Sequence, residues 1–171
     1  MYYFICMLNT ASLLVLASAC ANDKCVEACD EGWEKLGDHC YHWVAEKMNW
    51  TNAENSCQEK GGHLVSVSSN ETMGFVLLGA HSRGLKYIWL GGNDVEQEGV
   101  WKWTDCTPWE LELWGTTGQP DNAGGEHCLT IWDHGTVWND WTCSRETEFL
   151  CSRKICPTNS NSDYGISYFC Y

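Results

Sequence analysis

The stretch from Gln119 to Cys143 reads QPDNAGGEHCLTIWDHGTVWNDWTC, and it decides how the rest of the chain is interpreted. A hard cation such as Ca²⁺ takes about six to eight oxygen ligands, from carboxylates, amide carbonyls, backbone carbonyls and water. The alternative is a solvated acidic loop in a chain that is acidic throughout. The order of the ligand-type residues, with Cys128 and Cys143 beside them, favours a calcium site. The candidate ligands in this stretch are Gln119, Asp121, Glu126, Asn139 and Asp140.

Pro120 adds a geometric argument for that site. The bond before a proline is the only peptide bond that adopts the cis form at low cost. A cis bond would turn the side chains of Gln119 and Asp121 to the same side, where one ion could touch both. A cis bond between Gln119 and Pro120 would therefore suit the proposed site.

Outside this stretch, two segments have the pattern of a helix. Thr51–Glu54 has the form of a capping box and Gly61 is a suitable C-terminal stop, which predicts a helix near 52–60. Ser68–Glu71 is a second capping box, followed by apolar residues at helical spacing. The residues predicted to share a face are Ala53 and Cys57 in the first helix, and Met73, Val76, Leu77 and Ala80 in the second.

The remaining pattern consists of short strands and long loops. A cysteine-bounded hairpin from Cys29 to Cys40, which contains Trp33, precedes the first helix. The stretch 104–127 has no clear periodicity, and a loop of this length in a compact domain is usually functional. Two early helices followed by irregular strands indicate an α+β fold. The predicted strands are 63–67, 88–90, 100–103, 128–132, 136–141 and 148–152.

Residues 1–21 have the character of a secretory signal peptide. The run Ile5–Leu16 is largely apolar and small residues follow it, although the usual positive charges at its start are missing. This run is too short to span a bilayer. Cleavage frames end at Ala19 or Ala21, and the second removes two of the twelve cysteines and leaves an even ten. An unpaired thiol is unfavourable in an oxidising compartment, so we expect the mature chain to begin at Asn22.

The composition of the mature chain predicts a secreted, extracellular protein. Ten cysteines in about 150 residues indicate one disulfide-stapled domain. Sequons at Asn49 and Asn70 agree with that compartment and predict glycosylation at both. The net charge of −13 argues against nucleic acid and anionic membrane as partners. No second apolar run of membrane length follows in the sequence.

These features together resemble the long form of the C-type lectin-like domain. The similarity covers residues 29–153, with 22–28 as an N-terminal segment and 154–171 as a cysteine-containing tail. It implies an α+β C-type lectin-like fold, with two helices flanking small antiparallel sheets and a long calcium-binding loop. The residues that carry the resemblance are Cys29, Trp33, Cys40-Tyr41, Ala53-Glu54, Cys57, Gly61 to Ser66, Trp89-Leu90-Gly91-Gly92, Trp101 to Asp105, Trp138-Asn139-Asp140 and Phe149-Leu150-Cys151.

The resemblance also implies a calcium-dependent sugar site, in which the five candidate ligands bind both the ion and the sugar. In the family, Gln-Pro-Asp goes with galactose-type ligands and Glu-Pro-Asn with mannose-type ligands. A sugar hydroxyl has one proton and two lone pairs, so it can ligate the ion, accept from Gln119 and donate to Asp121. The expected partners are glycans with terminal galactose, GalNAc or related sugars. The disulfides implied by the resemblance are Cys29–Cys40, Cys57–Cys151 and Cys128–Cys143.

The sequence departs from the family pattern next to this site. Galactose binders of the family often carry a Trp two residues after the Asp, whereas this chain has Ala123. Trp141 is the alternative stacking surface for a sugar, and core packing is the competing interpretation of that ring. Trp109, Trp132 and Trp141 are the tryptophans that the core positions of the family do not explain.

A second, structural calcium ion is held in many relatives by an Asp and a Glu after the Trp-Ile-Gly-Leu strand. Asp94 and Glu98 match that pair. Asn122 and His127 occupy the other positions and are poorer ligands for a hard cation. A secondary site of Asp94, Glu98 and Asn122 therefore competes with a solvated turn.

Four cysteines lie outside the family set, and four cysteines allow three pairings. The termini of the family lie side by side, which favours Cys25–Cys156 and leaves Cys106–Cys170. A local Cys156–Cys170 loop and an interchain bridge through Cys106 are the alternatives.

Three classes of function compete at this point. The leading one is a secreted, calcium-dependent carbohydrate-binding protein that acts in glycan or microbial-surface recognition. A single shallow sugar site binds weakly, so useful avidity would need several sites, as in a homo-oligomer. The second is a protein- or mineral-surface binder on the same fold without sugar. The third is an enzyme, and the chain has no His-Glu-x-x-His, no Gly-x-Ser-x-Gly and no evident free nucleophilic cysteine. We therefore expect no enzymatic activity.

Overall fold

The computed structural model describes residues 25–115, 118–132 and 138–156. The predicted signal peptide 1–21, most of the tail 154–171 and Cys170 lie outside these ranges, and the predictions about them stay predictions. No helix among the described residues is long and apolar enough to cross a membrane. In chain order the elements are β1 (Glu34–Leu36), β2 (His39–Met48), α1 (Trp50–Glu59), β3 (His63–Leu64), α2 (Asn70–Ser82), β4 (Ile88–Asn93), β5 (Lys102–Trp103), β6 (Cys128–Ile131), β7 (Trp138–Trp141) and β8 (Thr147–Lys154).

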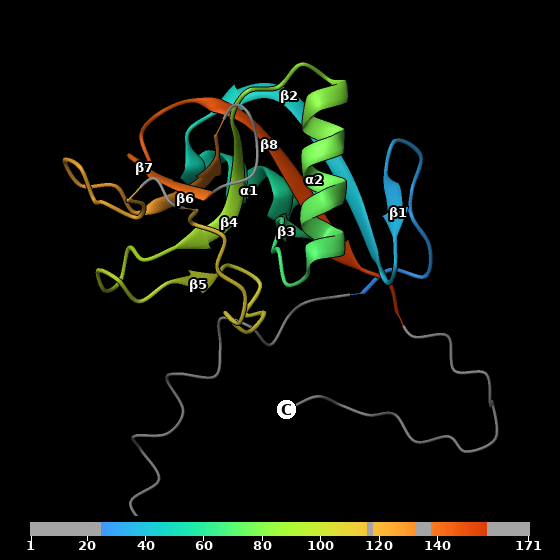
Figure 1. The fold of residues 1–171 in the computed structure, drawn as a ribbon. Coiled ribbons are helices and arrows are strands. Elements are labelled where there is room, and N and C mark those ends of the chain that lie inside the picture. Colours follow the sequence, from blue (N-terminus) through green and yellow to red (C-terminus); the bar gives the residue numbers. More distant parts are fainter. Residues whose placement is uncertain (1–24, 116–117, 133–137, 157–171) are drawn as a thin grey trace, which may run out of the picture.

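The strands form one connected sheet, whose main path runs β1-β2-β8-β4-β6-β7 (Figure 1). β3 pairs with β8, and β5 pairs with β4. All pairings are antiparallel except the one between β4 and β8, where Ile88 lies opposite Glu148. The α+β fold is therefore confirmed, with one mixed sheet in place of the small antiparallel sheets that we expected.

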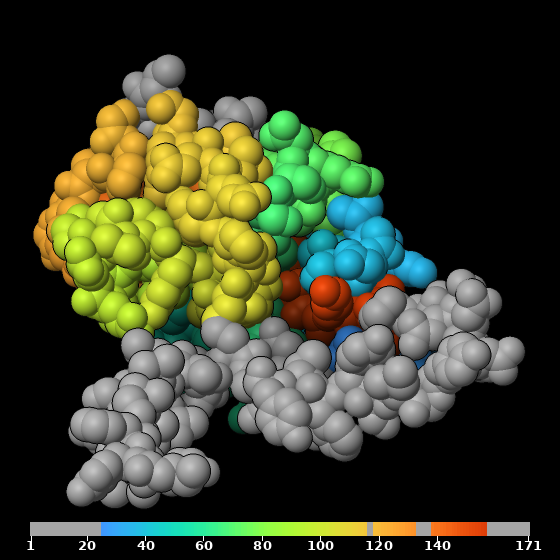
Figure 2. Space-filling model, turned by 90° about the horizontal axis from the view of Figure 1, so that it is seen from below, coloured from blue at the N-terminus to red at the C-terminus, as the bar shows by residue number. Residues whose placement is uncertain are grey.

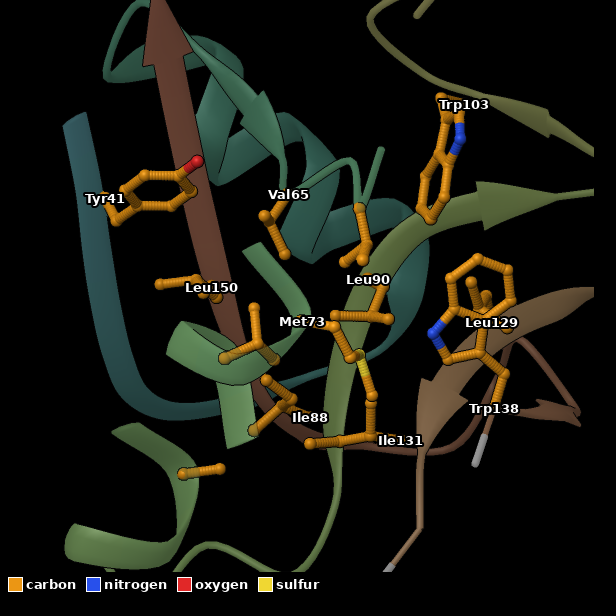
Figure 3. Close-up of a cluster of buried hydrophobic side chains, with 13 residues drawn as sticks. Tyr41, Val65, Met73, Ile88, Leu90, Trp103, Leu129, Ile131, Trp138 and Leu150 are labelled. Carbon is orange, nitrogen blue, oxygen red and sulfur yellow. The ribbon is translucent and has the colours of Figure 1, made fainter. Parts of the chain in front are cut away.

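The two helices lie on opposite faces of this sheet. Successive side chains of a strand point to opposite faces, and β8 shows this directly. Leu150 packs in one cluster with Val76 of α2, whereas Phe149 packs in another with Ala53 of α1. Figure 3 shows the first cluster, with Leu150 and Ile88 near α2 and Trp138 at the other end, toward β6 and β7. Burial of each helix against its own face accounts for the two-sided arrangement.

Both helices begin one or two residues away from the predicted caps. α1 begins at Trp50 because Asn49, not Thr51, is the N-cap, and its Oδ1 accepts from the backbone N–H of Asn52 at 2.9 Å. Glu54, expected to close the box, is only 6% exposed and accepts from the backbone N–H of Leu64 at 2.9 Å. The cap uses Oδ1, and a glycan would be attached to Nδ2, so glycosylation of Asn49 is compatible with it.

The second capping box is shifted by one residue. Ser69, not Ser68, caps α2, and its hydroxyl accepts from the backbone N–H of Thr72 at 3.1 Å. The predicted stop at Gly61 is confirmed: its φ of 76° lies in the left-handed region that favours glycine. The apolar faces are also confirmed, since Ala53, Cys57, Met73, Val76 and Ala80 are all buried and Leu77 packs against the core.

The strands after α2 are confirmed with shifted ends, but β2 was not predicted. It runs through the cysteine hairpin region to Met48 and is the longest strand of the described chain. Its sequence does not alternate cleanly, because its buried residues, Cys40 and Tyr41, occupy neighbouring positions and therefore lie on opposite faces of the sheet. β3 is shorter than the predicted strand 63–67: Val65 and Val67 are buried outside any strand.

Four disulfides are present among the described residues. They are Cys25–Cys156, Cys29–Cys40, Cys57–Cys151 and Cys128–Cys143. The first lies beside a parallel bridge between Val26 and Ile155, so the two ends of the described chain run together. All three pairs implied by the family resemblance and the first of the additional pairs are thereby confirmed.

Candidate calcium-binding site

The site is built on a long segment without regular structure, the part of 104–127 that the structure describes. Tryptophan packing attaches this segment to the sheet. Trp109, one of the unassigned tryptophans, lies 4.6 Å from Trp103 and 5.2 Å from Trp138 between ring centroids. The backbone N–H of Trp138 also donates to the carbonyl of Leu113 at 2.8 Å. Figure 2 shows this segment, in yellow, spread over one face beside the turn that follows β4.

The Gln119–Pro120 peptide bond is cis, the form that would turn the side chains of Gln119 and Asp121 to the same side. Beyond this bond, the carboxylate of Asp121 accepts from the backbone N–H of Ala123 at 3.1 Å, which closes a tight turn. The Oε1 atom of Gln119 is buried and has no hydrogen-bond partner among the described residues. A buried amide oxygen without a partner is costly, and a cation that it could ligate would satisfy it.

Asp140 fastens the Pro120 loop to β7. Asp140 is only 1% exposed, and it lies opposite Leu129 in the pairing of β6 with β7. One carboxylate oxygen accepts from the N–H of Asp121 at 3.3 Å and the other from the N–H of Asn122 at 2.7 Å. Each carboxylate oxygen has two lone pairs, so both retain acceptor capacity toward a metal ion.

Three carboxylates converge at this point. Asp121, Glu126 and Asp140 each offer an oxygen, and these oxygens lie within 4.8 Å of one another. Burial, followed by the charges of Asp140 and Asp121, raises the pKa of Glu126 above its ordinary value, while Arg145 acts in the opposite direction. Like charges held this closely favour either a shared proton or a bound cation. We call these three residues the primary cluster.

The last candidate ligand is Asn139, which lies beside Asp140 on β7. Its side-chain Nδ2 donates to the backbone carbonyl of Asp140. This contact orients the amide and leaves its oxygen as the ligand-type atom. The donor set around the primary cluster thus consists of carboxylate and amide oxygens, which suits Ca²⁺ better than a softer metal.

A second cluster lies next to the first and contains Asp94, Glu98 and His127, whose ligand-type atoms lie within 4.8 Å of one another. Asp94 is 1% exposed. His127 Nδ1 is 3.0 Å from an oxygen of Asp94 and 3.3 Å from an oxygen of Glu98. Asn122, expected as a secondary calcium ligand, points its Nδ2 at Glu98, with a distance of 2.7 Å. We call these four residues the secondary cluster.

Trp141 is partly buried and packs against neighbouring side chains. Its ring lies 4.9 Å from that of Tyr87 and 5.6 Å from that of Trp89, and the guanidinium of Arg145 lies over it at 4.6 Å. This arrangement favours the packing interpretation over sugar stacking. Ala123 is exposed and offers no ring. Trp132, the third unassigned tryptophan, is 44% exposed.

Sequence reasoning missed two features of the site. Asn122 has a φ of 47°, a left-handed conformation that Asn tolerates better than most residues, and the preceding cis-proline turn was the available signal. Arg145 approaches the site only because the Cys128–Cys143 disulfide and the β6–β7 pairing bring its segment back toward Glu126. No local pattern indicates that approach.

Comparison with known proteins agrees with this geometry. The family model described as the lectin C-type domain matches residues 46–153. The chain is 32% identical over 135 residues to "Galactose-specific lectin nattectin" of Thalassophryne nattereri, covering 77% of this chain and 84% of that one. Several other relatives, members of C-type lectin domain families 17 and 4, are longer, and the matched region spans 30% to 33% of their length.

Solved structures give the same result. The carbohydrate-recognition domain of the mouse scavenger receptor C-type lectin superposes with a TM-score of 0.68 at 34% identity, covering 75% of this chain and 98% of that one. Herring type II antifreeze protein superposes with a TM-score of 0.70 at 28% identity, covering 75% and 100%. The chain therefore belongs to the C-type lectin domain family, a family of non-enzymatic carbohydrate-binding domains.

Proposed function

We propose that this chain is a secreted, calcium-dependent lectin that binds terminal galactose or a related sugar. One observation carries the proposal: three carboxylates converge in the primary cluster, and Gln119, two residues before Asp121, has a buried side-chain oxygen without a hydrogen-bond partner among the described residues. Asp121, Glu126 and Asp140 would supply charge to the ion, and Gln119 and Asn139 would supply amide oxygens. The four disulfides and the sequons at Asn49 and Asn70 support an extracellular location.

The residues of the site would each have a defined task. A bound Ca²⁺ supplies coordination positions at which two neighbouring sugar hydroxyls replace water. The side-chain NH₂ groups of Asn139 and Gln119 can donate hydrogen bonds to the oxygens of those sugar hydroxyls. The carboxylates of Asp121 and Glu126 can accept hydrogen bonds from the same hydroxyls. Asp140, with both oxygens also holding backbone N–H groups, keeps the loop in register with β7.

The preference for galactose follows from the polarity of this arrangement. Gln119 presents a donor on one side of the ion and Asp121 an acceptor on the other, which is the reverse of a Glu-Pro-Asn site. The similarity to a relative named as a galactose-specific lectin supports the same assignment. Because Ala123 offers no ring and Trp141 is packed, we expect modest selectivity between galactose and other sugars. Avidity for a glycan-coated or microbial surface would then require several copies of the site.

A protein- or mineral-surface binder is the second candidate. The absence of an aromatic ring at Ala123 and the similarity to a type II antifreeze protein favour it. Such a function would use the same fold and would need no sugar. The complete set of five oxygen ligands argues for the lectin.

Binding to a glycan array, with calcium and again with EDTA, separates these candidates. The lectin predicts signals on terminal galactose or GalNAc that disappear in EDTA. Glu46→Ala is a matched control, because it removes one carboxylate from the exposed end of β2. Retention of galactose binding in excess EDTA at neutral pH would contradict the proposal, and a blank array in calcium would favour the surface binder.

A further inference from the structure

The secondary cluster differs from a metal site because its polar atoms already bind one another. Asp94 accepts from the backbone N–H of Gly99 at 2.8 Å and contacts His127 Nδ1 at 3.0 Å. Glu98 accepts from Asn122 Nδ2 at 2.7 Å and lies 3.3 Å from the same His127 nitrogen. Both carboxylates therefore already have nitrogen partners from this chain.

Asn122 is the residue that joins the two clusters. Its Nδ2 donates to Glu98, and its Oδ1 accepts from the backbone N–H of Glu126 at 2.8 Å. Its own backbone N–H donates to Asp140 at 2.7 Å. With both side-chain atoms engaged, the Asn122 amide is held between Glu98 on one side and the backbone of Glu126 on the other. Two of its three partners, Glu126 and Asp140, belong to the primary cluster.

We propose that Asn122 and His127 form a metal-independent clamp that holds the calcium loop against the turn 94–99, so that the chain binds one Ca²⁺ ion. This inference rests on the proposed function for the identity of that ion. The clamp connects Asp94 and Glu98, on the turn after β4, to Asn122 and His127, on either side of Glu126. Its physical role is to fix Glu126 and the backbone N–H of residue 122 before the ion arrives.

A clamp of this kind changes metal affinity without touching the metal. Outer-shell partners of a metal site typically contribute about 10- to 100-fold in affinity, because they orient the ligands. Removing Glu98 takes away the acceptor of Asn122 Nδ2 and one partner of His127, while all five proposed ligands remain. Asn122 and Glu98 are positioning residues in this account.

Calcium titration calorimetry tests the number of ions. We expect the wild type to bind one Ca²⁺, and Glu98→Ala to bind one Ca²⁺ about tenfold more weakly. Glu96→Ala is the matched control, because Glu96 lies on the same turn, its side chain is 79% exposed, and its only ion pair within the described residues is with Lys102. We expect it to change the affinity less than about twofold. Two ions in the wild type, with one lost in Glu98→Ala, would overturn the clamp.

Coupling between the two positioning residues gives a sharper test. Asn122→Ala alone should weaken calcium binding about tenfold or more, because its Oδ1 also positions Glu126. Adding Glu98→Ala to that variant should weaken it by less than about a further twofold, since the hydrogen bond between them is already lost. Fully additive losses would show that the two residues act separately and would contradict the clamp.

Amide hydrogen exchange in EDTA tests the clamp without any metal. The backbone N–H of Glu126 should be protected in the wild type and should exchange at least about tenfold faster in Asn122→Ala. The N–H of Val65, which donates to Leu150 in the core at 2.8 Å, serves as the internal reference for global unfolding. An unprotected Glu126 amide in wild-type protein would overturn the clamp. If the wild type bound no calcium, the proposed function and the single-ion statement would both fail, and this exchange experiment would still decide the clamp.

Discussion

The primary and secondary clusters are neighbours of similar composition, and they differ in what satisfies their charges. In the primary cluster three carboxylates lie close together, and none of them forms an ion pair with a Lys, Arg or His side chain of the described residues. In the secondary cluster the two carboxylates share His127 and accept from Asn122. Acidity alone therefore does not identify a calcium site. The cluster without a cationic partner is the one whose electrostatics favour a shared proton or a bound cation.

The largest expected effect comes from removing the Cys128–Cys143 disulfide, because it supports both clusters. The two cysteines are 15 positions apart in the sequence, and their disulfide holds the segment that contains Glu126 and His127 against β7. We expect the double variant Cys128→Ser/Cys143→Ser to lose about 3 kcal/mol of unfolding free energy. Denaturant unfolding in EDTA measures this loss. Loss of calcium binding should accompany it, and unchanged calcium affinity in a folded variant would show that the disulfide does not position the ligands.

Asp140→Ala should weaken calcium binding at the primary cluster and leave the fold intact. The variant loses one proposed ligand and leaves the N–H groups of Asp121 and Asn122 without their acceptor. We expect calcium affinity to fall at least about 100-fold, equivalent to about 2.7 kcal/mol. Calorimetry measures the affinity, and circular dichroism checks that the disulfide-held fold persists. Glu46→Ala is the charge-matched control, and an unchanged calcium isotherm for a folded Asp140→Ala protein would exclude Asp140 from the site.

Gln119→Glu combined with Asp121→Asn should change sugar preference at nearly constant calcium affinity. The swap keeps ligand number and net charge, and it exchanges the donor and acceptor sides of the site. We expect the ratio of galactose to mannose affinity to fall about tenfold, which corresponds to about 1.4 kcal/mol. Competition by free monosaccharides measures the ratio. If the double variant keeps its galactose preference, the shape of the loop 122–125 selects the sugar in place of hydrogen-bond polarity.

Glu126→Gln should have the smallest effect, on stability in EDTA. The pKa of Glu126 is raised by burial and by Asp140 and Asp121, so the folded state binds this proton more tightly than the unfolded chain. The protonated Glu126 carboxyl stabilises the fold fully at pH values below its pKa in the unfolded chain. This contribution to the unfolding free energy is lost as pH rises through its pKa in the folded protein. The neutral Gln avoids that loss, and we expect Tm at neutral pH to rise by about 1–2 °C relative to wild type.

Thermal unfolding in EDTA, from about pH 4 to pH 7, follows this difference. The gap between Glu126→Gln and the wild type should widen as pH rises and close in acid. A gap that does not depend on pH would remove the charge of Glu126 as its cause. With calcium present the order should reverse, because only the wild type keeps this carboxylate ligand.

The sequence was sufficient to predict those elements that depend on residues close together in the chain. The apolar faces of both helices and the short strands after α2 follow from a few neighbouring residues, and Pro120 marked the one peptide bond of the loop that could adopt the cis form at low cost. The family resemblance correctly implied the disulfides, which no spacing argument could assign. The predicted N-cap positions were wrong by one or two residues because several adjacent residues can cap a helix. In the folded chain, Asn49 and Ser69 are the N-caps.

The features that could not be predicted depend on residues far apart in the chain. β2 has mixed periodicity because residues on both of its faces are buried, as Cys40 and Tyr41 show. Trp109 packs on Trp103 and Trp138 in a segment with no periodic signal. The role of Asn122 depends on Glu98, which lies 24 residues earlier. Each of these is a consequence of the assembled fold.

The most direct test of the account asks whether sugar oxygens replace water on the bound ion. Tb³⁺ can substitute for Ca²⁺ at oxygen sites, and Trp138, next to Asn139, can sensitise its luminescence. Luminescence lifetimes in H₂O and D₂O then count the water molecules on the ion before and after galactose is added. The account predicts that about two water molecules leave when galactose binds, and that EDTA or Asp140→Ala abolishes the signal. Galactose binding with an unchanged water count would show that the sugar does not ligate the ion, and would contradict the central claim.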